Sequence, residues 1–437
     1  MSILEALHNG LERGQLLAGL PMRPAYRRME RHHPEEHQEN MNSLALGDNL
    51  EYMQWLLENG YEGKIRMIYI DPPFFTKSKF DATITLTDRN GKKNKIKHLA
   101  YDDTFDRNLE FYIENMTARL VLMRELLADD GLIWVHLDWH SAHYVKMLMD
   151  EIFGVKNFQN EIIWQYKSGG SGKKHFSRKH DTILVYSKTE KYYLNVPKEK
   201  SYNRGLKPYR FKGVKEYKDD YGWYTMVNMK DVWSIDMVGR TAAERNGYAT
   251  QKPMELMKRI VEASTEPGDY CADFFCGSGS LLEAAESLGR HWIGCDNEPL
   301  AVSTSRKRLD ARESAYDYYR DSISMHYGMV TLEKILSEPL ENGKDLLTCR
   351  VKEFRPEIDY GHIPIKDRDM AMKIGIEAPE NYIDYIMVDP DYDGDFKVKI
   401  LFREDLQEIR FQSMGDYAAV VVDVFGKEYF YDGRKEK

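Results

Sequence analysis

Four consecutive residues, Asp71, Pro72, Pro73 and Phe74, join an acid, two rigid backbone positions and an aromatic ring. They directly follow the apolar run 65–70, which we expect to be a buried strand. An open α/β sheet carries its chemistry at the carboxyl ends of its strands, so the strand delivers the tetrapeptide to that edge. An acceptor carboxylate, fixed prolines and a stacking ring suit a planar group bearing an amine, such as a nucleobase lifted out of its helix.

A glycine loop forms the second motif, Asp-Phe-Phe-Cys-Gly-Ser-Gly at 273–279, between an expected strand at 269–275 and an expected helix at 281–288. In that context, Gly-x-Gly lets the backbone approach a nucleotide-like ligand. Asp296 lies 17 residues after Gly279, where its carboxylate can accept both hydroxyls of a ribose. No third glycine stands at the pyrophosphate position, so a nucleoside cofactor with an amino-acid tail, S-adenosylmethionine, fits the pattern.

The two motifs together predict direct methyl transfer to an exocyclic nitrogen. An aromatic amine is a weak nucleophile because its lone pair is spread into the ring, so Asp71 and the carbonyl of Pro72 would accept its hydrogens. Phe74 would hold the base by stacking. The sulfonium supplies the electrophile, so catalysis depends mainly on orientation and needs no metal.

Each of these functional predictions has a purely structural alternative. Asp-Pro-Pro alone is more often a loop after a strand, and Asp296 can cap a helix that begins near Pro299. For the histidines after position 131 we favour structural roles over a metal site, with Asp138 at a strand end as the functional suspect. These residues are His136, Asp138, His140 and His143. Asp389-Pro390-Asp391-Tyr392 echoes the first motif, but it lacks the second proline and an accompanying glycine loop, which indicates a turn.

The distribution of charge predicts where partners bind. The formal net charge is −9, yet residues 164–218 hold 15 Lys or Arg against 4 Asp or Glu, whereas residues 355–437 hold 12 against 19. Aromatic residues interleave with the basic ones in 188–245, a composition suited to DNA recognition. The basic stretch 77–97 is expected as a mobile loop or hairpin. The candidates for DNA backbone contacts are Lys77, Lys79, Lys173, Lys174 and Arg178.

The length of 437 residues predicts two or three units. The expected segments are an N-terminal arm (1–41), the first part of an α/β core (42–187), a target-recognition insert (188–245), the second part of the core (246–314), a helical connector (315–354) and a β-rich C-terminal domain (355–437). The four cysteines show no metal-ligand spacing and are expected to be reduced. The sequence shows neither a secretory signal nor an apolar run long enough for a bilayer, which favours a cytoplasmic protein without a membrane role.

Over about residues 42–312, the chain resembles the β group of amino-methylating DNA methyltransferases, which includes modification subunits of type III restriction systems. The resemblance rests on the tetrapeptide at 71–74 preceding the loop at 273–279, on Gly47-Asp48, and on Thr-Gln-Lys-Pro at 250–253. It implies a Rossmann-like, S-adenosylmethionine-dependent α/β sheet with permuted motif order, an inserted recognition module and a small β-rich C-terminal domain.

The resemblance also implies roles for individual residues. Asp48 would meet the cofactor adenine, and Gln251 and Lys252 would lie near the cofactor carboxylate. The residues around its methionine part would be Asp273, Phe275, Gly277 and Gly279.

An initial Asp with a terminal aromatic resembles enzymes that methylate adenine N6 in double-stranded DNA. The alternatives are a cytosine N4 or RNA methyltransferase and a non-catalytic DNA specificity subunit. A homodimer and a restriction subunit with nuclease or translocase activity are the further expected partners, and the acidic C-terminal domain is the expected surface for protein contacts.

Overall fold

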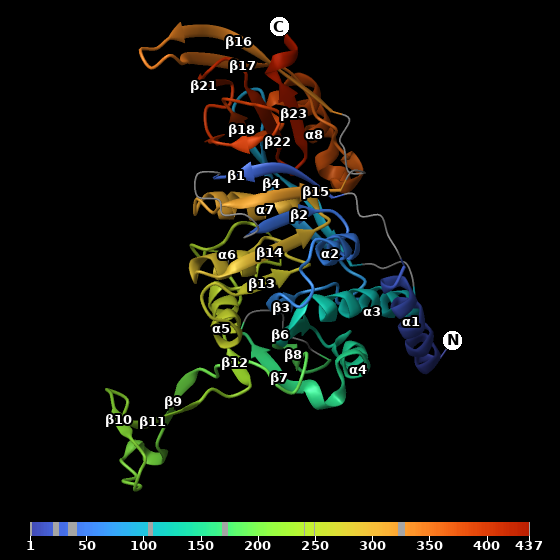
Figure 1. Cartoon of the computed structure of the whole chain (residues 1–437), viewed down its shortest axis with the longest axis vertical. Coiled ribbons are helices and arrows are strands. Elements are labelled where there is room, and N and C mark those ends of the chain that lie inside the picture. Colours follow the sequence, from blue (N-terminus) through green and yellow to red (C-terminus); the bar gives the residue numbers. More distant parts are fainter. Residues whose placement is uncertain are drawn as a thin grey trace.

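The computed structural model describes residues 2–20, 26–33, 42–103, 108–167, 174–239, 241–248, 250–321 and 328–436. A large mixed sheet runs through the molecule in the strand order β12-β7-β8-β6-β3-β13-β14-β2-β15-β1-β19 (Figure 1). Its parallel centre consists of β6 (Leu127–Leu137), β3 (Ile65–Ile70), β13 (Tyr270–Asp273), β14 (His291–Asp296), β2 (Ser43–Leu46) and β15 (Tyr316–Arg320). The expected α/β sheet is confirmed.

Three strands extend the sheet beyond β6. The antiparallel hairpin of β7 (Phe158–Gln165) and β8 (His180–Ser187) pairs with β6 through β8, and β12 (Val232–Ser234) lies parallel to β7. The connection between β7 and β8 is rich in glycine, and its residues 168–173 lie outside the described ranges.

Helices cover both faces of the sheet because its central strands are apolar on both sides, as in β3, where Ile65 and residues 67–70 are buried. One face packs against α2 (Asn49–Glu58), α3 (Leu109–Leu126) and α4 (Ala142–Phe153). The other packs against α5 (Met254–Ser264), α6 (Ser280–Ser287) and α7 (Pro299–Asp310). No helix in the described ranges is both long and apolar enough to cross a membrane.

The N-terminal segment is part of the core rather than a separate arm. Helix α1 (Ile3–Ala18) packs so closely on α3 that a Cβ at Gly14 would lie 2.5 Å from the carbonyl oxygen of Glu114. Strand β1 (Arg27–His32) pairs antiparallel with β15. Its sequence, Arg-Arg-Met-Glu-Arg-His, lacks apolar alternation, and charged partners distant in the chain compensate for that, such as Asp317, whose Oδ1 lies 2.9 Å from Nε of Arg31.

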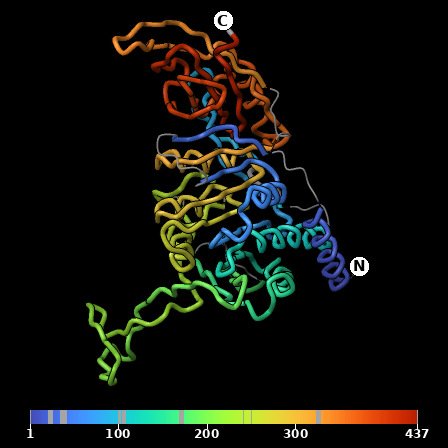
Figure 2. The backbone as a smooth tube through the Cα atoms, viewed as in Figure 1, coloured from blue at the N-terminus to red at the C-terminus, as the bar shows by residue number. Residues whose placement is uncertain are grey.

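Part of the segment that the sequence predicts to be a recognition insert leaves the body as a small antiparallel sheet of β9 (Lys198–Tyr202), β11 (Trp223–Asn228) and β10 (Glu216–Lys218). It extends away from the core at the end opposite the C-terminus (Figure 2). Tyr217 and Tyr224 stack across it with ring centroids 5.6 Å apart, while Tyr221 is 79% exposed. A segment of the expected insert 188–245 is therefore an exposed aromatic surface.

The prediction of a helical connector at 315–354 is wrong. Residues there form β15 and the long hairpin of β16 (Met329–Pro339) and β17 (Asp345–Arg355). Pairing with a strand far along the chain fixes this segment as part of a sheet, since β17 also pairs with β21 (Glu408–Ser413). The hairpin belongs to the C-terminal domain, whose β-rich character is confirmed.

The rest of the C-terminal domain contains helix α8 (Ile365–Glu377) and a sheet of β20 (Ile400–Phe402), β18 (Ile383–Asp389), β22 (Ala418–Asp423) and β23 (Glu428–Asp432). The tetrapeptide at 389–392 is a turn, as expected, in which Asp389 accepts a hydrogen bond from the backbone N–H of Asp391 at 3.2 Å. Strand β19 (Lys397–Val398) extends the main sheet alongside β1.

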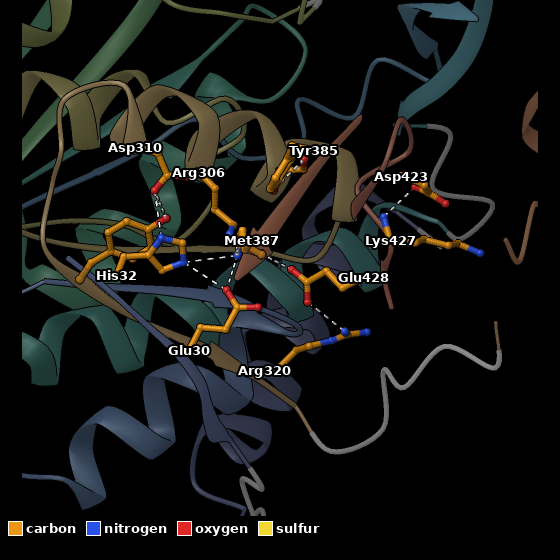
Figure 3. Close-up of polar contacts among 12 residues, drawn as sticks. Glu30, His32, Arg306, Asp310, Arg320, Tyr385, Met387, Asp423, Lys427 and Glu428 are labelled. Atoms are coloured by element: carbon orange, nitrogen blue, oxygen red, sulfur yellow. Dashed lines mark hydrogen bonds and ion pairs between the residues drawn. The ribbon is translucent and has the colours of Figure 1, made fainter. Parts of the chain in front are cut away.

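Two further features join the C-terminal domain to the core. The basic stretch after Phe74 forms a hairpin of β4 (Lys79–Thr87) and β5 (Lys93–Asp102), whose Ile84, Leu86 and Ile96 pack into the C-terminal core. Arg306 of α7 is fully buried and forms ion pairs with Glu30 of β1 and Glu428 of β23 (Figure 3).

Candidate active site

The two motifs open into one cavity. Strands β3 and β13 are parallel neighbours, with Cys271 beside Met67 and Ala272 beside Ile68, so the residues that follow them leave the same edge of the sheet. The cavity has a volume of about 460 Å³. Of the residues that the sequence assigned to catalysis or to the cofactor, the following line it: Asp48, Asp71, Pro72, Pro73, Phe74, Gln251, Lys252, Asp273, Phe275, Gly277 and Asp296.

Close packing under the glycine loop fixes its conformation. Gly277 and Gly279 have φ values of 50° and 71°, which side chains rarely adopt. A Cβ at Gly279 would lie 2.8 Å from Oγ of Ser305, and that hydroxyl donates to the carbonyl of Gly277 at 2.8 Å. Gly279 therefore shapes the loop from below without lining the cavity.

Asp296 holds the same loop from the side. Its Oδ2 accepts the backbone N–H of Gly277 at 2.8 Å, and its Oδ1 accepts the backbone N–H of Glu298 at 3.0 Å. Burial raises the pKa of Asp296, and burial likewise raises that of Asp273, which accepts the N–H of Phe275. Helix α7 has Glu298 as its N-cap and no side-chain capping bond, so Asp296 holds the turn before the helix and does not cap it. Its side chain lines the cavity, which is compatible with the ribose-binding interpretation.

The corner at Asp48 includes a residue that the sequence did not point to. Asp48 caps α2 by accepting the backbone N–H of Leu50 at 2.8 Å, and its Oδ1 also accepts from Arg119 at 2.9 Å. Arg119 reaches Asn49 as well, and Asn49 donates to the carbonyl of Phe274 at 2.6 Å. The Asp48 side chain remains 52% exposed toward the cavity.

Asp71 is held between a cation and an imidazole. Lys252 forms an ion pair with its Oδ2, and Nδ1 of His136 lies 3.6 Å from its Oδ1, which is buried and has no hydrogen-bond partner among the described residues. The register of β3 beside β6 explains why Asp71 lies near His136. Ile70 pairs with Val135, so the residues that follow them, Asp71 and His136, lie opposite each other. This register, and not the residue types alone, is the signal that could have identified His136.

The tetrapeptide loop and Gln251 are both anchored. The hydroxyl of Tyr112 donates to the carbonyl of Pro73 at 3.0 Å, and the Phe74 ring lies 5.9 Å from that of His136. Gln251 accepts the N–H of Asn246 at 2.9 Å and donates to a backbone carbonyl at 2.6 Å, so its amide holds the neighbouring loop in place.

The candidates for DNA contact lie outside the cavity. Lys77, Lys79 and Lys174 are exposed, and the guanidinium of Arg178 stacks 3.8 Å from the ring centroid of Trp139. Lys173 lies outside the described residues. Within the described ranges, no group of three or more His, Cys, Asp or Glu could hold a metal ion. All four cysteines are buried.

Comparison with solved structures gives low overall similarity. The crystal structure of the M1.HpyAVI–SAM complex aligns with a TM-score of 0.40 at 17% identity, covering 62% of this chain and all of that one. The PvuII cytosine-N4-specific DNA methyltransferase aligns with a TM-score of 0.42 at 17% identity, covering 65% and 90%.

Sequence comparison gives closer relatives. The type II methyltransferase M.EcaI of Enterobacter cloacae is 32% identical over 344 residues, covering 65% of this chain and 73% of the relative. The EcoP15I Mod subunit of Escherichia coli, from a type III restriction-modification enzyme, is 30% identical over 41% of this chain and 30% of its own length. A family model described as DNA methylase, N6_N4_Mtase, matches residues 65–307. The expected family is thus confirmed, and the chain belongs to the N6/N4 DNA methylases.

Proposed function

We propose that this protein is a site-specific DNA methyltransferase that transfers a methyl group from S-adenosylmethionine to N6 of an adenine flipped out of the double helix. The observation that carries the proposal is the single cavity of about 460 Å³ lined both by Asp71–Phe74 and by the glycine loop. An acceptor site for an amine and a loop suited to a nucleoside thus face the same space.

The lining of the cavity fits such a cofactor. Backbone at Gly277 can approach a ligand closely, and two acids, Asp48 and Asp296, line the same cavity as the loop. When bound, S-adenosylmethionine supplies a methyl group on a sulfonium, which is the electrophile. We assign Asp273, Phe275 and Gly277 to its methionine part, with Gly279 shaping the loop beneath them.

The amine would be oriented by the first motif. Asp71 and the Pro72 carbonyl accept its hydrogens, while Phe74 stacks on the base. A carboxylate oxygen has two lone-pair sites, so Oδ2 of Asp71 can keep its ion pair with Lys252 and still accept an amine hydrogen. Lys252 then holds Asp71 in place through this ion pair, a role different from the cofactor-carboxylate contact that the resemblance implied.

The surroundings support DNA as substrate. The exposed sheet at 198–228 carries aromatic side chains among lysines, and Lys77, Lys79, Lys174 and Arg178 supply positive charge outside the cavity. One relative is named as a type II methyltransferase and another as a subunit of a type III restriction-modification enzyme, and the second name supports a role beside a restriction activity. A restriction subunit, a second copy of the chain and residence in the cytoplasm are parts of the same proposal.

Mass spectrometry of nucleosides tests the proposal. The protein is incubated with double-stranded DNA and S-adenosylmethionine that carries a deuterated methyl group, and the DNA is then digested. We expect labelled N6-methyladenine from the wild-type protein and none from Asp71→Ala. Asp391→Ala, in the similar tetrapeptide at 389–392, is the matched control and should methylate normally. Labelled N4-methylcytosine, or DNA binding without any labelled nucleoside, would contradict the proposal.

A further inference from the structure

His136 lies at the centre of a buried polar chain behind Asp71. Its side chain is fully buried on β6, and its Nε2 lies 3.2 Å from Oδ2 of Asp181 on β8. Its Nδ1 lies 2.8 Å from the hydroxyl of Tyr69 and 3.6 Å from Oδ1 of Asp71. The hydroxyl of Tyr166 donates to the other oxygen of Asp181 at 3.1 Å. The imidazole thus stands between two carboxylates, one of which is the proposed amine acceptor.

Methyl transfer to an amine produces a proton that must leave the site. The amine nitrogen forms a bond to the methyl carbon while the carbon–sulfur bond breaks and its electron pair stays on sulfur. The nitrogen then carries one proton too many and releases it. Asp71 is the acceptor nearest to that nitrogen, but its side chain is only 17% exposed, and a flipped base in the cavity would cover it further.

We infer that His136 is the proton acceptor behind Asp71: the amine gives its proton to Oδ2 of Asp71, the carboxyl group turns so that the protonated oxygen faces His136, and Nδ1 of His136 takes the proton, with Asp181 balancing the imidazolium charge. This inference rests on the proposed function. It makes His136 a positioning and proton-holding residue that acts through Asp71, and it leaves Asp71 ionised for the next amine.

The direction of the transfer follows from ordinary acidities. An imidazole binds a proton more tightly than a carboxylate does, by on the order of two pKa units. Burial works against ionisation of Asp181, but the hydrogen bond and the charge of His136, together with Lys252, lower the pKa of Asp181. A carboxylate that stays ionised at Nε2 favours the imidazolium, as in hydrolase triads where an acid orients a histidine.

Tyr69 can accompany both protonation states of the ring. Burial raises the pKa of Tyr69 well above its usual value, so its hydroxyl keeps its proton. A hydroxyl donates to a neutral Nδ1 and, after rotation, accepts from a protonated one. The rings of Trp164 and Phe74 pack on His136 at centroid distances of 5.3 Å and 5.9 Å, which limits the access of water to the imidazole.

Variants of His136 test the inference through the rate of methyl transfer. In single-turnover reactions, His136→Gln should lower the rate roughly 10- to 100-fold without changing the KM for DNA. The pH–rate profile should also change shape, because His136 lies among the charged groups Asp71, Asp181 and Lys252. His143→Gln, the same substitution at an exposed position of α4, should match the wild type.

Chemical rescue separates proton transfer from packing. In His136→Ala, added imidazoles of graded pKa should restore the rate, and the rescued rate should follow the pKa of the added base. A rescue that ignores that pKa, or a loss seen only in KM, would overturn the inference.

A measurement on the ligand-free protein separates the inference from the proposed function. The titration of His136 is followed by nuclear magnetic resonance of the labelled imidazole nitrogens, with the signal assigned by its loss in His136→Gln. Asp181→Asn and Asp71→Asn should each lower the pH at which the ring titrates, and Tyr166→Phe should change it little. A titration unmoved by Asp71→Asn would overturn the inference whether or not the protein methylates DNA. A wild-type protein that methylates nothing would instead contradict the proposed function.

Discussion

Two clusters in this molecule each place a histidine between two acids beside a cation. In the cavity, His136 lies between Asp71 and Asp181, with Lys252 paired to Asp71. In the interdomain cluster, His32 lies between Glu30 and Asp310, with Nε2 3.1 Å and Nδ1 3.0 Å from the respective carboxylates, and Arg306 pairs with Glu30 and Glu428 (Figure 3).

The clusters differ in their charge balance and in what surrounds them. The interdomain acids meet two arginines, since Arg320 lies 3.1 Å from Glu428, and side chains fill the space, with Arg306 stacked 4.4 Å from the ring centroid of Tyr318. The cavity carries further acids, Asp273 and Asp296, whose pKa values burial raises. In the interdomain cluster, acids and arginines balance, and this arrangement joins two parts of the fold. Around the cavity, acids are in excess, and this excess suits a ligand that bears positive charge.

The largest expected effect of a single change is on catalysis at Asp71. Asp71→Ala should lower the rate of methyl transfer by about 10⁴-fold, because it removes the acceptor for the amine hydrogens and leaves Lys252 without its partner. The rate is measured in single-turnover assays, with DNA binding followed in parallel. Residual activity within about tenfold of the wild type would remove Asp71 from the reaction.

The interdomain cluster should respond in stability and not in catalysis. Arg306→Met should lower the free energy of unfolding by about 3 to 5 kcal/mol, because it leaves the carboxylates of Glu30 and Glu428 buried without their cation. Denaturant titration measures this loss. Arg312→Met, which breaks the ion pair with Glu283 at a 40% exposed side chain, is the control and should cost less than about 1 kcal/mol. An equal loss of unfolding free energy in Arg306→Met and Arg312→Met would contradict the proposed difference between the buried cluster and an exposed ion pair.

The glycine loop should show a middle-sized effect on both stability and ligand binding. Gly279→Ala should lower the free energy of unfolding by about 1 to 3 kcal/mol and weaken S-adenosylmethionine binding, because the new Cβ meets Ser305 at a positive φ. Gly60→Ala has a comparable φ of 81° but no atom within 4 Å, so it isolates the backbone strain. Calorimetry measures both quantities. A Gly279→Ala protein that binds the cofactor as Gly60→Ala does would contradict the loop assignment.

The smallest effect expected is on the pH dependence of stability at His32. Burial opposes charging of His32, but the ion pair and hydrogen bond with Asp310 and the hydrogen bond with Glu30 raise its pKa. A pKa raised in the folded state stabilises the protein below the ordinary value near 6.5, and that stabilisation is lost as pH rises through the folded pKa. His32→Gln should therefore destabilise the protein more at pH 6 than at pH 9. A destabilisation independent of pH would show that His32 is neutral in the folded protein.

Local patterns allowed the central fold to be predicted from the sequence. The apolar runs of β3 and β13 and the turns after them specify strands whose ends carry Asp71 and the glycine loop, because strands buried on both faces read as continuous apolar stretches. The strand near the edge of the fold was not predicted, because its own sequence carries no apolar pattern. Strand β1 is charged, and it joins the sheet through partners such as Asp317 that lie nearly 300 residues away.

The candidate site divides in the same way. Asp71, Phe74, Gly277 and Asp296 could be found because residue type, motif and position after a strand coincide at each of them. His136, Arg119 and Asp181 could not, because their roles depend on which strands and helices become neighbours. Only the register of β6 beside β3 places an imidazole behind Asp71.

A crystal structure of the protein with DNA and a non-reactive analogue of S-adenosylmethionine tests the central claim most directly. The distance to measure is that from the Asp71 carboxylate to the exocyclic nitrogen of the flipped base. The account predicts an adenine stacked on Phe74, with N6 within hydrogen-bond distance of Asp71 and the analogue lying on the glycine loop. A target base outside this cavity, or an analogue bound away from residues 273–279, would contradict it.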